Sequence, residues 1–324
     1  MKRFRFKSIL ILFTAIILMA GCGKKEETSV ANSSKDPASN KIKVITTFYP
    51  MYEFTKNVAG DRADVQLLIP STIEPHDWEP SPKDMANIQS ANIFIYNSEY
   101  METWVLNVQK SIKSDKLSFV EASKGITLAE GGDEDHHDGE EGHDEHDHHH
   151  EMDPHVWLSP VLAQKEVESI TAALIKADPN NKEAYEKNSD AYIAKLKQLD
   201  NDFREGLKNI KKKEMITQHA AFGYLAKEYG LKQVPIAGLS PDQEPSPAKL
   251  GELKKFAKQH DVKVIYFEEL ASPKVAQTLA NEIGAKTQVL NTLEGLSKED
   301  QDKGLDYIKV MENNLEILKQ SQSK

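Results

Sequence analysis

Cysteine is nearly absent from this sequence of 324 residues, which has only one, at position 22. A single cysteine excludes a disulfide framework and any zinc finger built on cysteine ligands. The formal net charge of −10 argues against a nucleic-acid partner, because phosphate binding requires a basic face. Hydrophobic residues make up 39% of the chain, enough for a buried core, and the length suits one large domain or two of ordinary size.

Several motifs of catalysis and transport are missing as well. The sequence contains no glycine-rich phosphate loop, no nucleophile elbow and no H-E-x-x-H pair. After residue 20 no apolar run is long enough for a transmembrane helix. Any membrane channel or nucleotide-driven motor that works with this protein is therefore expected to be a separate chain.

The first 21 residues have the pattern of a secretory signal peptide. Four basic residues precede an apolar stretch over residues 8–20, and ~13 residues are too few for a durable transmembrane helix. The stretch ends at Gly21-Cys22, which resembles the lipobox of bacterial lipoproteins, although Met19 stands where leucine is usual. We therefore predict a signal peptide over residues 1–21, a lipid on Cys22 and a flexible polar tether over residues 22–40.

From residue 41 onward, short β-branched runs alternate with helical patterns. Strands that alternate with helices of roughly 10–15 residues indicate βαβ units and parallel sheets. The expected strands are residues 44–47, 65–69, 93–96, 117–120, 214–217, 234–237, 262–267 and 287–290. The sequence therefore predicts an α/β protein with two Rossmann-like (βα)4 lobes.

One long helix is expected between the two sets of strands. Residues 180–205 contain neither glycine nor proline, and their apolar residues recur at helical spacing after a suitable start at Asp178-Pro179. Gly206 costs about 1 kcal/mol relative to alanine, so we expect the helix to fray or end there. We predict an N-terminal lobe over residues 41–177, a linking helix over 178–211 and a C-terminal lobe over 212–324. The alternative is a long surface helix within one domain.

An acidic, histidine-rich loop interrupts the first lobe at residues 133–151. It holds ten acidic residues, seven histidines and two glycines, and so accounts for the whole net charge of the chain. Lacking apolar residues, it cannot form a core; the alternatives are a flexible metal collector or a solvated acidic spacer. As a collector it would bind weakly and release metal below about pH 6. Its predicted auxiliary ligands are His136, His137, His143, His146, His148, His149 and His150.

Three further histidines lie on connections that lead into helices. His76 follows the second expected strand, His155 directly precedes a helix, and His219 ends the first strand of the second half. Ligands of two-lobed α/β proteins commonly bind beyond the carboxyl ends of strands, so these imidazoles are candidates for one metal site. Neutral imidazole is a favoured zinc ligand, and three imidazoles leave one position for a carboxylate or water. The candidate carboxylates are Glu268, Glu269 and Glu294.

Four motifs, in this order, resemble a known family. They are Glu74-Pro75-His76-Asp77-Trp78-Glu79-Pro80-Ser81-Pro82, Asp153-Pro154-His155-Val156-Trp157-Leu158-Ser159-Pro160, Thr217-Gln218-His219-Ala220-Ala221-Phe222-Gly223-Tyr224 and Leu290-Asn291-Thr292-Leu293-Glu294-Gly295-Leu296. From about Lys41 to its end, the chain is similar to the zinc-binding solute-binding lipoproteins of bacterial ABC uptake transporters, a cluster that also contains manganese-binding relatives. Thr292 stands where the family often has proline. The resemblance implies two α/β lobes joined by a single long rigid helix, with the metal site in the cleft between them.

The resemblance also implies a set of metal ligands, namely His76, His155, His219 and Glu294, whereas Glu268 and Glu269 would end the preceding strand without touching metal. The manganese-binding relatives have a carboxylate at the position of His219, and exchanging that oxygen for imidazole favours Zn²⁺. Glu294 would then fill the open position that a catalytic zinc needs.

The implied function is that of a receptor rather than an enzyme. It would capture Zn²⁺ outside the cytoplasm and deliver it to an ABC permease, which with its ATPase is a separate chain. We expect a monomer without a nucleic-acid partner, held by its lipid at the outer face of the bacterial cell membrane. A manganese or iron receptor of the same architecture and, less favoured, a zinc-dependent hydrolase remain alternatives. The sequence carries no information on an adhesin role.

Overall fold

The computed structural model describes residues 41–131 and 151–322. The predicted signal peptide, Cys22, the tether and the seven loop histidines lie outside the described residues. Residues 41–324 form one compact unit. Within its described part, no helix is both long enough and apolar enough to cross a membrane.

The first half of this unit is a parallel sheet of four strands. Its order is β2-β1-β3-β4, with Val44 paired to Val65 on one side and to Ile93 on the other. All four residues of β3 are buried because helices cover both faces of the sheet, as is usual for parallel strands. Its elements are β1 (Ile42–Thr46), α1 (Tyr49–Ala59), β2 (Ala63–Leu67), α2 (Pro82–Gln89), β3 (Ile93–Tyr96), α3 (Val105–Ser111) and β4 (Ser118–Glu121).

The second half repeats this topology. Its sheet has the order β6-β5-β7-β8, again parallel throughout. Its elements are β5 (Glu214–Thr217), α6 (Gly223–Glu228), β6 (Lys232–Pro235), α7 (Pro247–Gln259), β7 (Val264–Phe267), α8 (Lys274–Ile283) and β8 (Lys286–Val289). The predicted fold class of two parallel α/β sheets is confirmed, and strands 93–96 and 214–217 have the predicted bounds.

Strand β6 begins and ends two residues earlier than predicted. The prediction followed the apolar residues of 234–237, but β6 is an edge strand and starts with the polar Lys232 and Gln233. An edge strand pairs on one side only and tolerates polar residues. The first two residues of β6 therefore carry no hydrophobic pattern from which a strand could be predicted.

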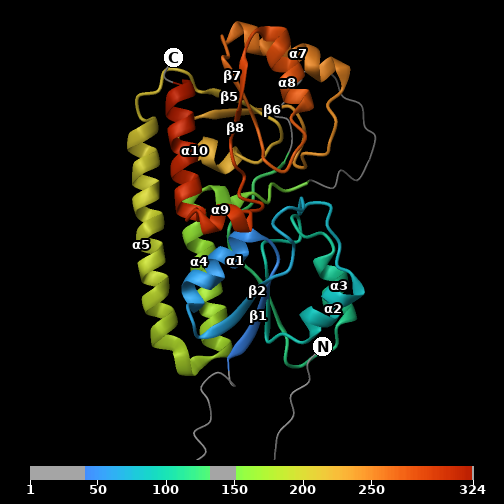
Figure 1. Ribbon diagram of the computed structural model, residues 1–324, viewed down its shortest axis with the longest axis vertical. Coiled ribbons are helices and arrows are strands. Elements are labelled where there is room, and N and C mark those ends of the chain that lie inside the picture. Colours follow the sequence, from blue (N-terminus) through green and yellow to red (C-terminus); the bar gives the residue numbers. More distant parts are fainter. Residues whose placement is uncertain (1–40, 132–150, 323–324) are drawn as a thin grey trace, which may run out of the picture. The chain divides into compact units, whose positions relative to one another are not determined.

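Helices α4 (Pro160–Ala177), α5 (Lys182–Leu207) and α10 (Tyr307–Gln322) run along one side of the two halves (Figure 1). Helix α5 packs against α1 and α4 and also against α10. It ends at Leu207, as expected near Gly206, where a β-carbon would lie only 3.0 Å from Cδ1 of Leu315 in α10. The glycine thus allows α5 and α10 to approach closely. These elements are η2 (Val156–Leu158), α4 (Pro160–Ala177), η3 (Pro179–Asn181), α5 (Lys182–Leu207), α9 (Lys298–Asp302) and α10 (Tyr307–Gln322).

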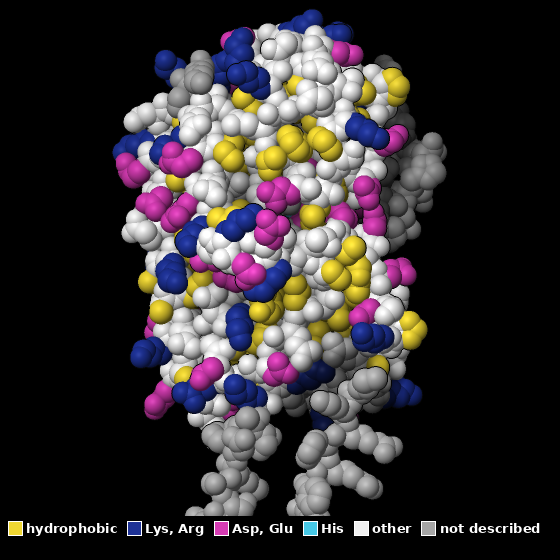
Figure 2. Space-filling view, in the orientation of Figure 1, with side chains coloured by type: hydrophobic (Ala, Val, Ile, Leu, Met, Phe, Trp, Pro, Cys, Tyr) yellow, Lys and Arg dark blue, Asp and Glu magenta, His cyan; other side chains and the backbone are white. Residues whose placement is uncertain are grey.

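One hydrophobic core extends through both halves. It includes Phe48 of the first half, Leu196 of α5 and Tyr266 of β7. Two smaller clusters lie on the other sides of the sheets, beneath α2 and α3 in the first half and beneath α7 and α8 in the second. Acidic and basic side chains are interspersed over the face seen in Figure 2, in line with a net charge that resides in the histidine-rich loop.

Candidate metal centre

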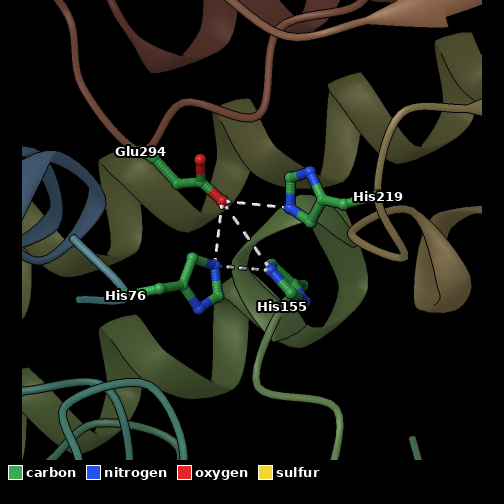
Figure 3. Close-up of side chains that lie close together, drawn as sticks. All are labelled: His76, His155, His219 and Glu294. Carbon is green, nitrogen blue, oxygen red and sulfur yellow. Dashed lines mark hydrogen bonds and ion pairs between the residues drawn. The ribbon is translucent and has the colours of Figure 1, made fainter. Parts of the chain in front are cut away.

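Four side chains from four separate segments converge on one point (Figure 3). His76 comes from the connection between β2 and α2, and His155 stands directly before η2. His219 follows β5, and Glu294 lies on the connection between β8 and α9. Each offers one ligand atom, and these four atoms all lie within 4.8 Å of one another. The three predicted histidines and the predicted glutamate are thus brought together.

The ligand atoms are close enough together to bind one ion. Oε1 of Glu294 lies 3.4 Å from Nε2 of His76, 3.7 Å from Nε2 of His155 and 3.5 Å from Nε2 of His219. The Nε2 atoms of His76 and His155 are 3.2 Å apart. With bonds of about 2.0–2.1 Å to zinc, a tetrahedron has edges of about 3.3–3.4 Å. Four of the six distances between donor atoms thus lie near the edges of such a tetrahedron, and all six are within 4.8 Å.

The pocket is closed except at His76. His155 and His219 are fully buried and Glu294 is 3% exposed. The His76 side chain retains 8% exposure and is the most exposed of the four ligands. Among the described residues, Nε2 of His219 and Oε1 of Glu294 have no hydrogen-bond partner although they are buried. Buried polar atoms without a hydrogen bond are rare, and two that face the same point are consistent with a bound cation.

Two carboxylates outside the four-donor group orient two of the imidazoles. Nδ1 of His155 is hydrogen-bonded to Oδ1 of Asp153 at 2.8 Å. Nδ1 of His219 lies 3.2 Å from Oε1 of Glu268. In His155 the hydrogen bond to Asp153 keeps the proton on Nδ1 and turns the lone pair of Nε2 toward the metal, whereas Glu268 contacts His219 as an ion pair without hydrogen-bond geometry.

Sequence reasoning missed these two roles. The Asp-Pro-His spacing around Asp153 was a usable signal, because a carboxylate two residues before a histidine can reach its ring. No such signal existed for Glu268, which is 49 residues from His219 in the chain. The other candidate, Glu269, lies elsewhere, in a groove lined by Asn291 and Asp300.

Burial and charge act in opposite directions on the titration of this group. Burial lowers the pKa of His155. For His219 burial has the same effect, but the carboxylates of Glu268 and Glu294 outweigh it and raise the pKa to about 10. Burial would raise the pKa of Glu294, yet His219 and His76 hold it well below its usual range. The pocket without metal therefore holds a proton on His219, which an incoming cation must displace.

The Glu294 connection is held in a specific backbone conformation. Leu293 has a φ of +58°, a left-handed value that is unusual for a leucine. Its N–H donates to Oδ1 of Asn291 at 2.7 Å. The side chain of Asn314 in α10 in turn accepts from the N–H of Asn291 and donates to its carbonyl. This clamp from α10 fixes the position from which Glu294 reaches the pocket.

The fold and this pocket define a class: an α/β protein of two parallel sheets with a preformed, buried site of three histidines and one carboxylate. Residues 44–321 match the family described as zinc-uptake complex component A, periplasmic (ZnuA). The chain belongs to this family, and the resemblance noted in the sequence is confirmed.

Individual relatives agree with this assignment. The chain is 63% identical over 317 residues to the high-affinity zinc uptake system protein ZnuA of Bacillus subtilis (strain 168), covering 98% of each. It is 52% identical over 295 residues to the zinc-binding lipoprotein AdcA of Streptococcus pneumoniae, covering 90% of this chain but only 58% of AdcA. The crystal structure of the Zn(II)-bound ZnuA-like domain of that AdcA superposes with a TM-score of 0.75 at 49% identity, covering 88% of this chain and all of that domain.

Proposed function

We propose that this protein is the receptor of a zinc-uptake system, which captures Zn²⁺ outside the cytoplasm and delivers it to an ABC permease. The observation that carries the proposal is the buried group of four donor atoms, three nitrogens and one oxygen, that all lie within 4.8 Å of one another. Membership of a family of uptake components supports a role in transport rather than catalysis. The permease and its ATPase are separate chains.

The ligands in this proposal are His76, His155, His219 and Glu294. Three nitrogens and one oxygen suit Zn²⁺, whereas Mn²⁺ and related hard ions prefer sites richer in carboxylate. A manganese or iron receptor is therefore the second candidate. The carboxylate of Glu294 at the fourth corner argues against the hydrolase alternative, since a catalytic zinc keeps that corner for water or substrate.

We further propose the cellular setting predicted from the sequence. Residues 1–21 would be removed as a signal peptide, Cys22 would carry the lipid, and residues 22–40 would tether a monomeric receptor to the outer face of the cell membrane. The compact unit that begins at residue 41 supports this tether boundary, and the name of AdcA as a lipoprotein supports the lipid. The separate sheets of the two halves support lobes over residues 41–177 and 212–324, with 178–211 as the linking segment.

The histidine-rich loop is proposed as an auxiliary zinc collector that feeds the buried site. The chain segments at the two ends of the loop are hydrogen-bonded to each other, since the N–H of Gly131 donates to the carbonyl of Glu151 at 2.6 Å. The N–H of Asp153, the partner of His155, donates to the carbonyl of Ala129 at 2.8 Å. Metal released from the loop would therefore be freed close to the buried ligands.

Replacement of one ligand tests the function. In His219→Ala, we expect zinc affinity measured by titration calorimetry to fall by on the order of 100-fold or more, because a ligand contributes at least as much as the groups that orient it. His260→Ala is the matched control, because His260 follows α7 and its Nδ1 lies 3.2 Å from Glu214, outside the metal centre. The zinc affinity of this variant should equal that of the unchanged protein. Unchanged affinity in His219→Ala would refute the site. Preferential binding of Mn²⁺ or iron by the unchanged protein in competition would favour the second candidate.

A further inference from the structure

The two oxygens of the Glu294 carboxylate have different surroundings. Oε1 faces the three histidines, as Figure 3 shows. Oε2 instead accepts a hydrogen bond from the hydroxyl of Thr292 at 2.9 Å. Both residues are buried, with 4% of Thr292 and 3% of Glu294 exposed, so no solvent competes strongly for this bond.

The hydroxyl of Thr292 is itself held in place through its backbone. The indole Nε1 of Trp157 donates to the carbonyl of Thr292 at 2.8 Å. The hydroxyl of Tyr307 donates to the carbonyl of Trp157 at 2.5 Å, which ties this arrangement to α10. The ring of Trp157 also lies 5.1 Å from that of His155, so the same residue borders the pocket. Thr292 thus presents its hydroxyl from a fixed position.

We propose that Thr292 determines metal specificity by restricting Glu294 to a single coordinating oxygen. This inference rests on the proposed zinc function. With Oε2 occupied, the site offers three nitrogens and one oxygen, the four-coordinate set that suits Zn²⁺. If Oε2 were free, the carboxylate could bind through both oxygens and supply a fifth donor. A larger number of oxygen ligands suits Mn²⁺ and other hard cations, which would narrow the preference for zinc.

The hydrogen bond from Thr292 to Oε2 of Glu294 disfavours coordination of the metal by both carboxylate oxygens. Turning Oε2 toward the metal would break a hydrogen bond to a charged group and leave a buried hydroxyl without its partner.

Thr292→Val and Thr292→Ser provide the test. Valine has nearly the shape of threonine without the hydroxyl, whereas serine keeps the hydroxyl and loses only a methyl group. We expect the ratio of Zn²⁺ to Mn²⁺ affinity, measured by competition titration, to fall roughly tenfold in Thr292→Val and to stay near the original value in Thr292→Ser. With Co²⁺ in place of zinc, the visible spectrum should change from the intense bands of a four-coordinate ion to the weaker bands of a five-coordinate ion in the valine variant alone.

The outcomes separate this inference from the proposed function. If the unchanged protein binds no zinc, the proposed function fails. If it binds zinc but Thr292→Val keeps both the metal ratio and the four-coordinate cobalt spectrum, the role of Thr292 is overturned. Thermal unfolding of each protein without metal checks the fold. Should the valine variant not fold, Thr292→Ala lacks the hydroxyl as well and carries the same expectations.

Discussion

At the scale of single residues, the metal centre is not the only place where carboxyl groups are buried. Glu166 of α4 is fully buried, and neither of its carboxyl oxygens has a hydrogen-bond partner among the described residues. Burial, reinforced by Glu102, raises the pKa of Glu166 well above its usual range. Burial also raises the pKa of Glu102 to about 7, although its carboxylate accepts hydrogen bonds from Thr47, Asn97 and Ser98. Burial of Glu166 therefore favours the protonated carboxyl group in the folded state over the unfolded one.

Glu166→Met should stabilise the protein at neutral pH. The pKa of Glu166 is higher in the folded state than in the unfolded chain, where it is about 4.3. The free energy of unfolding therefore decreases as the pH rises above about 4.3. Methionine has a similar volume and no carboxyl group, so we expect a gain of about 1–3 kcal/mol in the free energy of unfolding at pH 7 and a smaller gain at pH 5. Urea unfolding of the metal-free protein at both pH values measures this. Glu168→Met, at an exposed position of the same helix, should change little; a less stable Glu166→Met at pH 7 would contradict the argument.

The residues of the site differed in how far the sequence alone could identify them. His76, His155 and His219 could be singled out because each stands on a short polar connection leading into a helix. For the fourth ligand, the sequence pattern alone did not distinguish among three candidate glutamates. Only the family resemblance favoured Glu294. The contact of Glu268 with His219 depends on how β5 and β7 lie side by side, which no local pattern encodes.

At the scale of elements, strands were predicted best where they are central and apolar. Strand β3 has four consecutive buried apolar or aromatic residues, whereas the edge strand β6 begins with polar ones and was misplaced by two residues. Helix α10 was not assigned from the sequence, although it supplies Asn314 to the clamp on the Glu294 connection. Its role depends on packing against α5, a contact between segments far apart in the chain.

Two of the site's connections touch each other through a glycine. A β-carbon on Gly295 would lie 2.1 Å from the carbonyl oxygen of Ser71, far closer than atoms can approach. Ser71 belongs to the connection that carries His76, and Gly295 directly follows Glu294. The absence of a side chain at Gly295 therefore allows two ligands from different halves of the chain to meet.

Gly295→Ala should separate these two connections. We expect zinc affinity to fall roughly tenfold or more, because overpacking of about 1–3 kcal/mol must be relieved by moving backbone next to two ligands. Titration calorimetry measures the loss. Gly251→Ala is the control, since its β-carbon would meet nothing within 4 Å on the exposed side of α7 and should leave zinc binding unchanged. Equal affinities in the two variants would show that the close approach has no bearing on the site.

At the scale of the whole molecule, the proposed function divides the handling of zinc between the buried site and the histidine-rich loop. The four ligand atoms of the buried site already lie within 4.8 Å of one another, so binding there requires little ordering of the chain. The loop has ten acidic residues and seven histidines but no apolar residue, so any site it forms must be ordered by the metal itself. We therefore expect tight binding at the buried site, and additional, weaker and more pH-sensitive capacity in the loop.

Replacing residues 133–150 with a short Gly-Ser segment should separate the two functions. The antiparallel bridge between Glu130 and Met152 already brings the ends together, so the replacement closes the chain without strain on Asp153. We expect the affinity of the buried site to stay within about threefold, or roughly 0.6 kcal/mol, while the number of zinc ions bound at pH 7.5 falls to one. Below about pH 6 the loop imidazoles are protonated, so the stoichiometries of the two proteins should converge. A full-length variant with the seven loop histidines changed to serine should behave like the replacement in calorimetry and metal analysis. Loss of tight binding in both would mean that the loop forms part of the main site.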